Sequence, residues 1–276
     1  MCSLRFRCLI SFMIMTVASV VNAQVTVYYD KLVAAIDTIS KSCVPIEVLK
    51  THSFGTGTLF GIPSSETAVS GIVVVATAKH VMNGSDTARV IFQLKSGGKE
   101  GRLYKVFAEH SKLDIVFLRP VETTRSFSEY DVTTYGPAGT ARYSRMKRGQ
   151  TIVIAGYPLR LGSEMQYLNP VVQMGTIAQV DSANDIVLID VPVNPGNSGC
   201  PAYVLLEDGH LALMGLVFQY QEKTDYVLRP RPDFETKYKS GARKIDDLYL
   251  VVPETSSLGR VELFSGFMDE IYELRK

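Results

Sequence analysis

The segment from Asn194 to Pro201 surrounds one serine, Ser198, with turn-forming residues. The glycines on both sides and a preceding proline favour a tight turn, which leaves the hydroxyl exposed and lets backbone N–H groups converge on one point. Acyl transfer needs this geometry, because the attacking hydroxyl creates a tetrahedral oxyanion that the N–H groups of Gly196 and Ser198 are placed to stabilise. An ordinary surface turn is the alternative interpretation of this composition.

A serine hydroxyl is a weak nucleophile at neutral pH, so a base must accompany it. The chain contains 4 His. His80 follows an apolar run that ends at Ala76 and precedes a predicted turn at Asn83 and Gly84, and the rigid end of a strand holds an imidazole well. A buried core histidine is the alternative for His80. We interpret the other three as solvated loop residues: His52, His110 and His210.

Asp114 is the carboxylate predicted to orient this imidazole. It heads an otherwise apolar strand that runs to Leu118, where a buried charge is costly unless it is paired. A paired carboxylate fixes the tautomer of a histidine and stabilises its charged form. An aspartate in a strand-start turn is the alternative, but the chain order His80, Asp114, Ser198 favours a triad whose base and acid lie in the first half of the chain.

The elements that must position these residues are short β-strands. Apolar, β-rich runs are spaced by turn residues along most of the chain, about a dozen in all. The clearest are residues 71–75, 88–92, 114–118, 151–155, 171–180, 185–191, 211–220 and 248–252. This pattern predicts an all-β barrel or sandwich, with the polar, glycine-bearing segment 125–149 as the joint between two halves.

Helical periodicity occurs only near the two ends of the chain. A first helix is predicted from Asp30, with Leu32, Val33, Ile36 and Ile39 on one side. A second is predicted from the recurrence of Phe267, Ile271 and Leu274.

Composition excludes several classes of protein. The chain is 46% hydrophobic and 21% charged, as in a folded globular protein rather than a disordered one. Lys plus Arg (29) nearly balances Asp plus Glu (28), so no strong field of one sign exists to attract nucleic acid. No cluster of His, Cys or carboxylates has metal-ligand spacing, so we expect neither a metal nor a cofactor.

The first residues predict an export signal that is cleaved after Ala23. Arg5 and Arg7 precede an apolar run from Cys8 to Val21. An uncleaved membrane anchor is the alternative, because no charge appears between Cys8 and Tyr29 and this stretch is long enough to span a bilayer. We expect cleavage, export to the periplasm or the exterior, and no stable membrane insertion of the mature protein.

With these motifs in this order, the chain resembles the trypsin-like serine peptidases of the chymotrypsin fold, and among them the HtrA-like bacterial branch. The resemblance covers about residues 50 to 254. Its motifs are Gly55-Thr56-Gly57-Thr58-Leu59, Thr77-Ala78-Lys79-His80-Val81, Leu113-Asp114-Ile115-Val116, Ala155-Gly156-Tyr157-Pro158 and the run from Asp190 to Gly199. The fold it implies is two six-stranded antiparallel β-barrels, with the active site in the cleft between them.

Together with the resemblance, the residue patterns predict a signal peptide at 1–23, an N-terminal helical extension at 24–49, a peptidase domain at 50–254, and a C-terminal helix at 255–276. The first barrel would cover about 50–130 and the second about 145–254. Only 22 residues follow Glu254, so we expect no PDZ-type peptide-binding domain.

The resemblance further assigns the floor of the primary specificity pocket to Pro192 and Val193, and its wall to the strand that contains Gly215 and Leu216. None of these residues is charged, so a small or medium apolar side chain is the expected occupant. The insertion 221–244, which follows this strand, either rims the pocket or forms a solvated surface loop, and we favour the loop.

Two departures from the family pattern concern the nucleophile turn. Cys200 stands where a second glycine is usual and adds a side chain beside a tight turn. Asn197 stands where the digestive enzymes carry a carboxylate that pairs with a freed N-terminus, so we infer no zymogen step. Cys43 and Cys200 are the only cysteines after the signal; a disulfide and two buried free thiols both remain open, and we favour free thiols.

The predicted function is that of a serine endopeptidase acting on protein or peptide substrates through His80, Asp114 and Ser198. A peptidase-like fold that has lost activity and binds or scaffolds other proteins is the alternative. Loss of activity usually removes a triad member, and here all three are present. The sequence does not indicate an oligomeric state.

Overall fold

The structure, a computed structural model, describes residues 30–63, 71–122, 127–134, 141, 145–230 and 249–263. The predicted signal peptide lies outside the described residues, as do residues 264–276 of the predicted C-terminal helix. No helix within the described ranges is long and apolar enough to cross a membrane.

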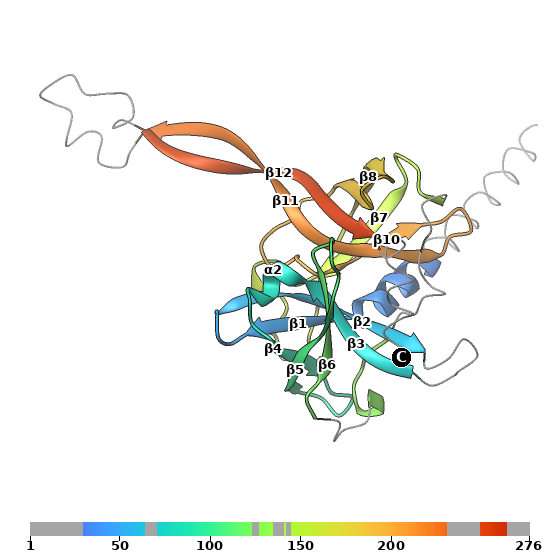
Figure 1. Ribbon diagram of the computed structural model, residues 1–276. Helices are drawn as coiled ribbons and strands as arrows, with labels where there is room; N and C mark the ends of the chain where they lie inside the picture. The colour runs from blue at the N-terminus through green and yellow to red at the C-terminus, as the bar shows by residue number, and fades with distance from the viewer. Residues whose placement is uncertain are drawn as a thin grey trace, which may run out of the picture.

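Two closed six-stranded barrels make up the fold, and the predicted all-β, chymotrypsin-like architecture is confirmed. In the first barrel the strand order is β1-β2-β3-β6-β5-β4, and in the second it is β10-β11-β12-β9-β8-β7. Every neighbouring pair is antiparallel, and the pairs β1·β4 and β10·β7 close the two barrels. Figure 1 shows the two barrels packed against each other, with the chain passing from one to the other between β6 and β7.

The described strands alternate with short turns and loops. Their bounds are β1 Cys43–Val48, β2 Ser53–Pro63, β3 Gly71–Ala78, β4 Thr87–Gln93, β5 Lys99–Glu109, β6 Ile115–Pro120, β7 Thr151–Gly156, β8 Val171–Asp181, β9 Ile186–Asp190, β10 Pro201–Leu205, β11 Leu211–Pro230 and β12 Tyr249–Leu263. The helical pieces are residues 30–40, α2 Lys79–Met82, and the 3₁₀ turns η1 Phe127–Glu129 and η4 Pro158–Arg160.

Both outer boundaries of the peptidase domain differ from the prediction. The first barrel begins with β1 at Cys43, within the segment predicted as an N-terminal extension, because β1 must pair with β2 and β4 to close the barrel. At the other end, residues 255–263 continue β12 and are not helical. Val261 and Leu263 are buried in the second barrel, and β12 pairs with β9 and β11, so the strand is fixed by long-range partners.

The helix over residues 30–40 packs by one side onto the barrels, as predicted for part of its apolar set. Ile39 is buried and Ile36 is partly buried, whereas Val33 is exposed. Ser42, which follows the helix, shares a buried hydrogen bond of 2.8 Å with the Tyr203 hydroxyl of the second barrel. Ser42 also accepts a hydrogen bond from the backbone N–H of Leu59 at 2.8 Å, so it contacts both barrels.

The three largest of four hydrophobic clusters of buried residues hold the described fold together. One fills the first barrel and includes Leu59 and Val75, and another fills the second barrel and includes Ile154 and Val187. The third joins the barrels, since it combines Phe60, Val74 and Phe117 of the first with Val153, Tyr203, Leu213 and Leu216 of the second. Burial of apolar area therefore stabilises the packing of the barrels as well as each barrel itself.

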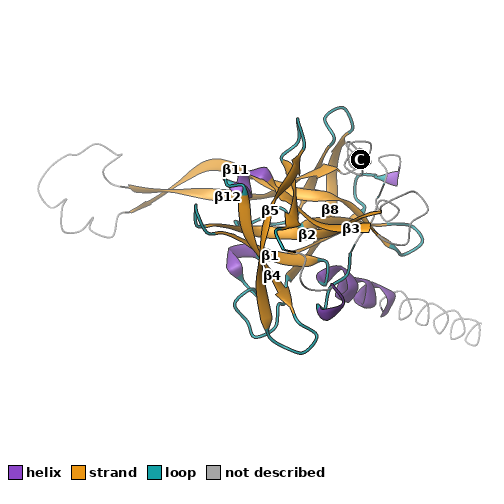
Figure 2. Ribbon diagram, turned by 60° about the horizontal axis from the view of Figure 1, so that its bottom comes forward, coloured by secondary structure: helices purple, strands orange, loops and turns teal. Residues whose placement is uncertain are grey.

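The insertion at 221–244 begins as a β-strand and not as a loop. Strands β11 and β12 pair beyond the barrel, with register shifts after Tyr220 and after Lys223, as far as Pro230 opposite Tyr249. Residues 231–248 lie outside the described residues. Figures 1 and 2 both show this hairpin projecting away from the two barrels. The part of the insertion that the structure describes is therefore strand, and it leads away from the two barrels.

Gly215 tests the packing of β12 against β11. A Cβ atom at this position would lie 1.8 Å from the carbonyl oxygen of Glu262, which is backbone and cannot turn aside. We expect Gly215→Ala to lower the free energy of unfolding by about 3 kcal/mol, measured by denaturant unfolding. In the matched control Gly101→Ala, the Cβ meets only the flexible end of Arg89, and the change should stay within about 1 kcal/mol. Equal losses in the two variants would contradict this account.

Candidate active site

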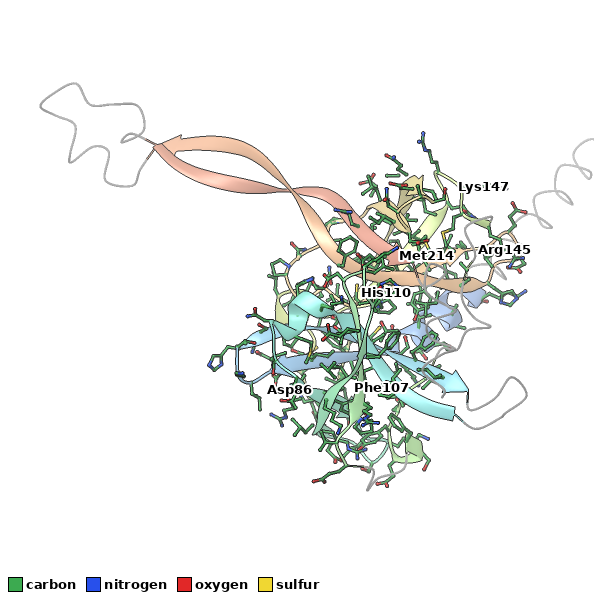
Figure 3. The ribbon with its side chains drawn as sticks, in the orientation of Figure 1. Asp86, Phe107, His110, Arg145, Lys147 and Met214 are labelled. Carbon is green, nitrogen blue, oxygen red and sulfur yellow. The ribbon has the colours of Figure 1, made fainter. Side chains whose placement is uncertain are left out.

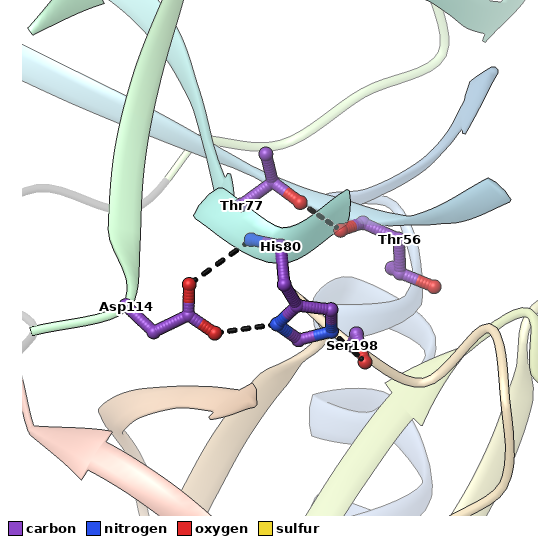
Figure 4. Close-up of polar contacts among 5 residues, drawn as sticks. All are labelled: Thr56, Thr77, His80, Asp114 and Ser198. Carbon is purple, nitrogen blue, oxygen red and sulfur yellow. Dashed lines mark hydrogen bonds and ion pairs between the residues drawn. The ribbon is translucent and has the colours of Figure 1, made fainter. Parts of the chain in front are cut away.

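His80, Asp114 and Ser198 are brought together where residues of the two barrels meet (Figure 4). The Nδ1 atom of His80 lies 2.5 Å from Oδ2 of Asp114, and its Nε2 atom lies 2.8 Å from Oγ of Ser198. The imidazole thus bridges the hydroxyl and the carboxylate, which is the arrangement that a general base of a serine nucleophile requires. The His80 side chain is 48% exposed, so a substrate has access to it.

The register between β3 and β6 places the base beside the acid. Ala78 pairs with Ile115, so the chain leaves β3 directly opposite the start of β6. The backbone N–H of Lys79 donates to the carbonyl oxygen of Asp114 at 3.1 Å, and the backbone N–H of His80 donates to Oδ1 of Asp114 at 3.0 Å. Both carboxylate oxygens of Asp114 are therefore occupied by His80, one by its ring and one by its backbone.

His110 is buried, and the prediction that it is a solvated loop residue is wrong (Figure 3). Its Nδ1 atom accepts hydrogen bonds from the backbone N–H groups of Lys112 (3.1 Å) and Leu113 (2.8 Å). Its carbonyl oxygen accepts from the Lys79 ammonium group. The imidazole thereby shapes the turn that leads into Asp114. His52 and His210 are exposed, as predicted.

The nucleophile turn depends on two glycines with positive φ angles. Gly196 has φ +97° and Gly199 has φ +83°. A Cβ on Gly196 would lie 2.4 Å from the carbonyl oxygen of Tyr157, and one on Gly199 would lie 2.1 Å from that of Thr56. Among the described residues, neither the Gly196 N–H nor the Ser198 N–H donates a hydrogen bond within the protein. These two donors are available to a bound group, as the predicted oxyanion hole requires.

Thr56 connects the nucleophile turn to the first barrel. Its N–H donates to the carbonyl oxygen of Ser198 at 2.9 Å, and its hydroxyl donates to the carbonyl oxygen of Gly196 at 2.7 Å and accepts from the N–H of Tyr157 at 3.0 Å. Its own carbonyl oxygen accepts from the Thr77 hydroxyl at 2.8 Å (Figure 4). In the sequence, Thr56 stands out only as part of the motif Gly55-Thr56-Gly57-Thr58-Leu59, and the pattern predicted no role for its side chain.

Alternation along β2 explains why threonines can do this. Leu59 faces the core of the first barrel, and a Cβ on Gly57 would meet the core residues Val75 and Ile46. Thr56 and Thr58, which alternate with Gly57 and Leu59, face the second barrel. There the Thr58 hydroxyl donates a hydrogen bond to the carbonyl oxygen of Gly199 at 3.2 Å. The glycine–threonine alternation is the sequence signal for this contact.

Asn197 and Cys200 fit the turn without disturbing it. Asn197 is fully buried, and its amide group donates to Oε1 of Gln173 at 3.1 Å. Cys200 is buried in the second-barrel core, and its N–H donates to the carbonyl oxygen of Asn197 at 2.9 Å. Cys43 and Cys200 are both free thiols, as favoured from the sequence. Burial raises the pKa of Cys43 to about 12 and that of Cys200 well above its usual range, so neither is a reactive thiolate.

The residues predicted to form the specificity pocket are not brought together at an open surface. Val193 belongs to the second-barrel core and Leu216 to the cluster between the barrels. Gly215 packs against the backbone of β12, and only Pro192 is exposed. The carbonyl oxygen of Pro192 accepts a hydrogen bond from Gln173 Nε2 at 2.8 Å. The side chains of Val193 and Leu216 therefore support the barrel wall.

A protein-family model matches a large part of the chain. The family model of the trypsin-like peptidase domain matches residues 55–212, which is more than half of the chain and includes His80, Asp114 and Ser198. A search of curated protein sequences gives no match.

Among the described residues, no group of three or more His, Cys, Asp or Glu side chains is placed to hold a metal ion.

Two solved structures that are similar to the chain are the following. The crystal structure of Deg5 has 17% sequence identity and a TM-score of 0.49, and the match covers 69% of this chain and 85% of that chain. Rv3671c from M. tuberculosis H37Rv, a serine-to-alanine mutant in an inactive form, has 16% identity and a TM-score of 0.50, with coverage of 87% and 89%. At such identities the likeness concerns the fold alone. On the match of the family model, this chain belongs to the trypsin-like peptidase family.

Proposed function

We propose that the protein is a serine endopeptidase that hydrolyses peptide bonds through an acyl-enzyme intermediate. The observation that carries this proposal is the continuous hydrogen-bonded chain from Ser198 Oγ through His80 to Asp114. Membership of the trypsin-like peptidase family supports protein or peptide substrates. The balance of charges in the sequence offers no comparable support for a nucleic-acid partner.

The chemistry follows from where each group lies. Ser198 Oγ attacks the scissile carbonyl while His80 Nε2 takes its proton, and Asp114 stabilises the imidazolium that forms. The N–H groups of Gly196 and Ser198 donate to the oxyanion. His80 then gives the proton to the leaving amine, and a water molecule, activated by the same imidazole, releases the acyl group and restores the Ser198 hydroxyl.

We further propose that the mature protein begins at Gln24 and acts outside the cytoplasm. The charged start, the apolar run and the small residue Ala23 of the sequence support this. The competing function is that of a catalytically inactive scaffold protein. The first experiment below distinguishes the active peptidase from this scaffold.

Ser198 is tested by covalent labelling. A fluorophosphonate probe reacts with an activated serine, so the mature protein should be labelled at Ser198, and Ser198→Ala should lose both labelling and peptide hydrolysis while keeping its melting temperature. The control is Ser96→Ala, which removes an exposed hydroxyl in a hairpin and should behave like the wild type. An unlabelled wild type, or hydrolysis that survives in Ser198→Ala, would contradict the proposal.

Asp114 is tested by Asp114→Asn. The amide keeps the size of the side chain but cannot accept hydrogen bonds at both oxygens, so it no longer fixes the tautomer of His80. We expect kcat to fall by roughly 10⁴, measured with a peptide ester or a small peptide substrate. Asp131→Asn is a matched control, since Asp131 is half-exposed and pairs with Lys41 away from the triad. A loss of similar size in the control, or a mild effect at Asp114, would remove the assigned role.

Activation is tested on protein that begins at Gln24. Asn197 pairs with Gln173 and has no ionic latch to make, so the mature chain should cleave an unfolded substrate such as casein without a further cut. A chelator should leave the rate unchanged. Intact mass before and after the assay shows whether a further cut has occurred. Activity that appears only after such a cut contradicts the latch argument, and inhibition by the chelator contradicts a metal-free mechanism.

A further inference from the structure

Glu262 is a buried carboxyl group behind the triad that the mechanism above does not use. It lies on β12, paired with Leu216 of β11 and Ile186 of β9. Its neighbours Val261 and Leu263 point into the second barrel, so Glu262 points to the outer face, which is covered here by the first barrel. Only 5% of the residue is exposed.

The group that Glu262 meets there is Asp114. The backbone N–H of Asp114 donates a hydrogen bond to the Glu262 carboxyl group. Asp114 is thus held on its backbone N–H by Glu262, on its carbonyl oxygen by Lys79, and on both side-chain oxygens by His80. Among these contacts, the one from Glu262 comes from the second barrel, which also carries Ser198.

An acidic residue at this position is costly. Oε2 of Glu262 is buried without a hydrogen-bond partner among the described residues, and a buried carboxylate that is not fully paired loses its hydration energy. Burial and, to a smaller extent, the charge of Asp114 raise the pKa of Glu262, while the Asp114 N–H, Arg260 and Lys79 lower it, and the net value is about 7. Packing alone would be better served by an apolar side chain, so the acid calls for a functional reason.

The charged groups around Glu262 come from three elements. Asp114 precedes β6, Lys79 belongs to α2, and Arg260 lies two residues earlier on β12, where its guanidinium group sits 4.9 Å above the ring of Phe218. Lys79 donates to the carbonyl oxygen of His110. Lys79 and Arg260 lower the pKa of Glu262, whereas the carboxylate of Asp114 raises it, so Asp114 supplies the like charge beside Glu262.

We propose that Glu262 is a positioning residue of the triad: it holds the backbone of Asp114 from the second barrel and, when ionised, places a second negative charge behind the pair formed by Asp114 and His80. This inference rests on the proposed function. The transition state of acyl transfer carries a positive imidazolium, so a negative charge behind Asp114 stabilises the transition state more than the resting enzyme. Protonation of Glu262 removes that contribution, and the enzyme loses rate in acid for two reasons, at His80 and at Glu262.

The test is Glu262→Gln, which keeps an oxygen to accept from the Asp114 N–H but carries no charge. We expect kcat at pH 8 to fall on the order of tenfold with an unchanged KM, because the residue acts through Asp114 and not on substrate. The midpoint of the acid limb of the kcat/KM profile should move to lower pH, because one negative charge no longer favours the imidazolium. Glu262→Asp, which keeps the charge, should retain a midpoint closer to that of the wild type. Glu207→Gln, at an exposed carboxylate that pairs with Lys147, is the control and should change neither quantity.

Stability gives a second measurement that does not depend on activity. The pKa of Glu262 is higher in the folded protein, about 7, than its ordinary value of 4.5, so wild-type stability falls as the pH rises from the lower value to the higher one. The melting temperature of Glu262→Gln should therefore exceed that of the wild type at pH 8, and the difference should shrink toward pH 5. A purely structural role would give no shift of the acid limb.

The outcomes are distinguishable. An acid limb and a kcat identical to those of an active wild type would overturn this inference and leave the proposed function intact. A wild type that neither reacts with the fluorophosphonate probe nor hydrolyses peptides would overturn the proposed function and this inference with it. A lower kcat, a shifted acid limb and a pH-dependent gain in melting temperature, all absent from Glu207→Gln, support it.

Discussion

Ser198 meets His80 only if the two barrels keep a fixed position relative to each other. The hydrogen bonds of Thr56, next to the triad, fix that position. One residue of β2 contacts the backbone of Ser198, Gly196 and Tyr157, all of which belong to the second barrel. Backbone groups on a buried turn must be satisfied or pay the cost of dehydration. A displacement of one barrel against the other would therefore leave several of these backbone groups unpaired at once. The free energy of the contact thus rises sharply with a small displacement.

The apolar cluster between the barrels supplies the affinity that the threonine contacts lack. Hydrogen bonds exchanged with water are worth little net, whereas buried rings and aliphatic groups stabilise in proportion to the area that they remove from water. Phe60 and Phe117 of the first barrel pack with Tyr203 and Leu216 of the second, and the helix over residues 30–40 adds Ile39 to the same cluster. The apolar contacts thus favour association, and the polar ones select a single arrangement.

The sequence was sufficient to predict the parts of the fold whose pattern is local. Strands such as β3 and β9 are continuous apolar runs between turn residues. The order of His80, Asp114 and Ser198 along the chain indicated the resemblance to the peptidase family. The sequence was insufficient where long-range pairing decides. β1 carries a proline at its centre and is recognisable only once its partners are known, and residues 255–263 are strand because β9 and β11 flank them. The burial of His110 depends on a turn that its own ring organises. The residues assigned to the pocket point elsewhere, Val193 into the second-barrel core and Leu216 into the cluster between the barrels.

The projecting hairpin of β11 and β12 gives the molecule an anisotropic outline. A compact chain of this size has a radius of gyration of about 18 Å, and the strand from Gln221 to Pro230 by itself extends about 30 Å at about 3.3 Å per residue. Friction in solution grows with the longest dimension rather than with mass alone. A single copy of this protein therefore diffuses and rotates more slowly than a sphere of 30.5 kDa, and an apparent size taken from gel filtration overstates its mass.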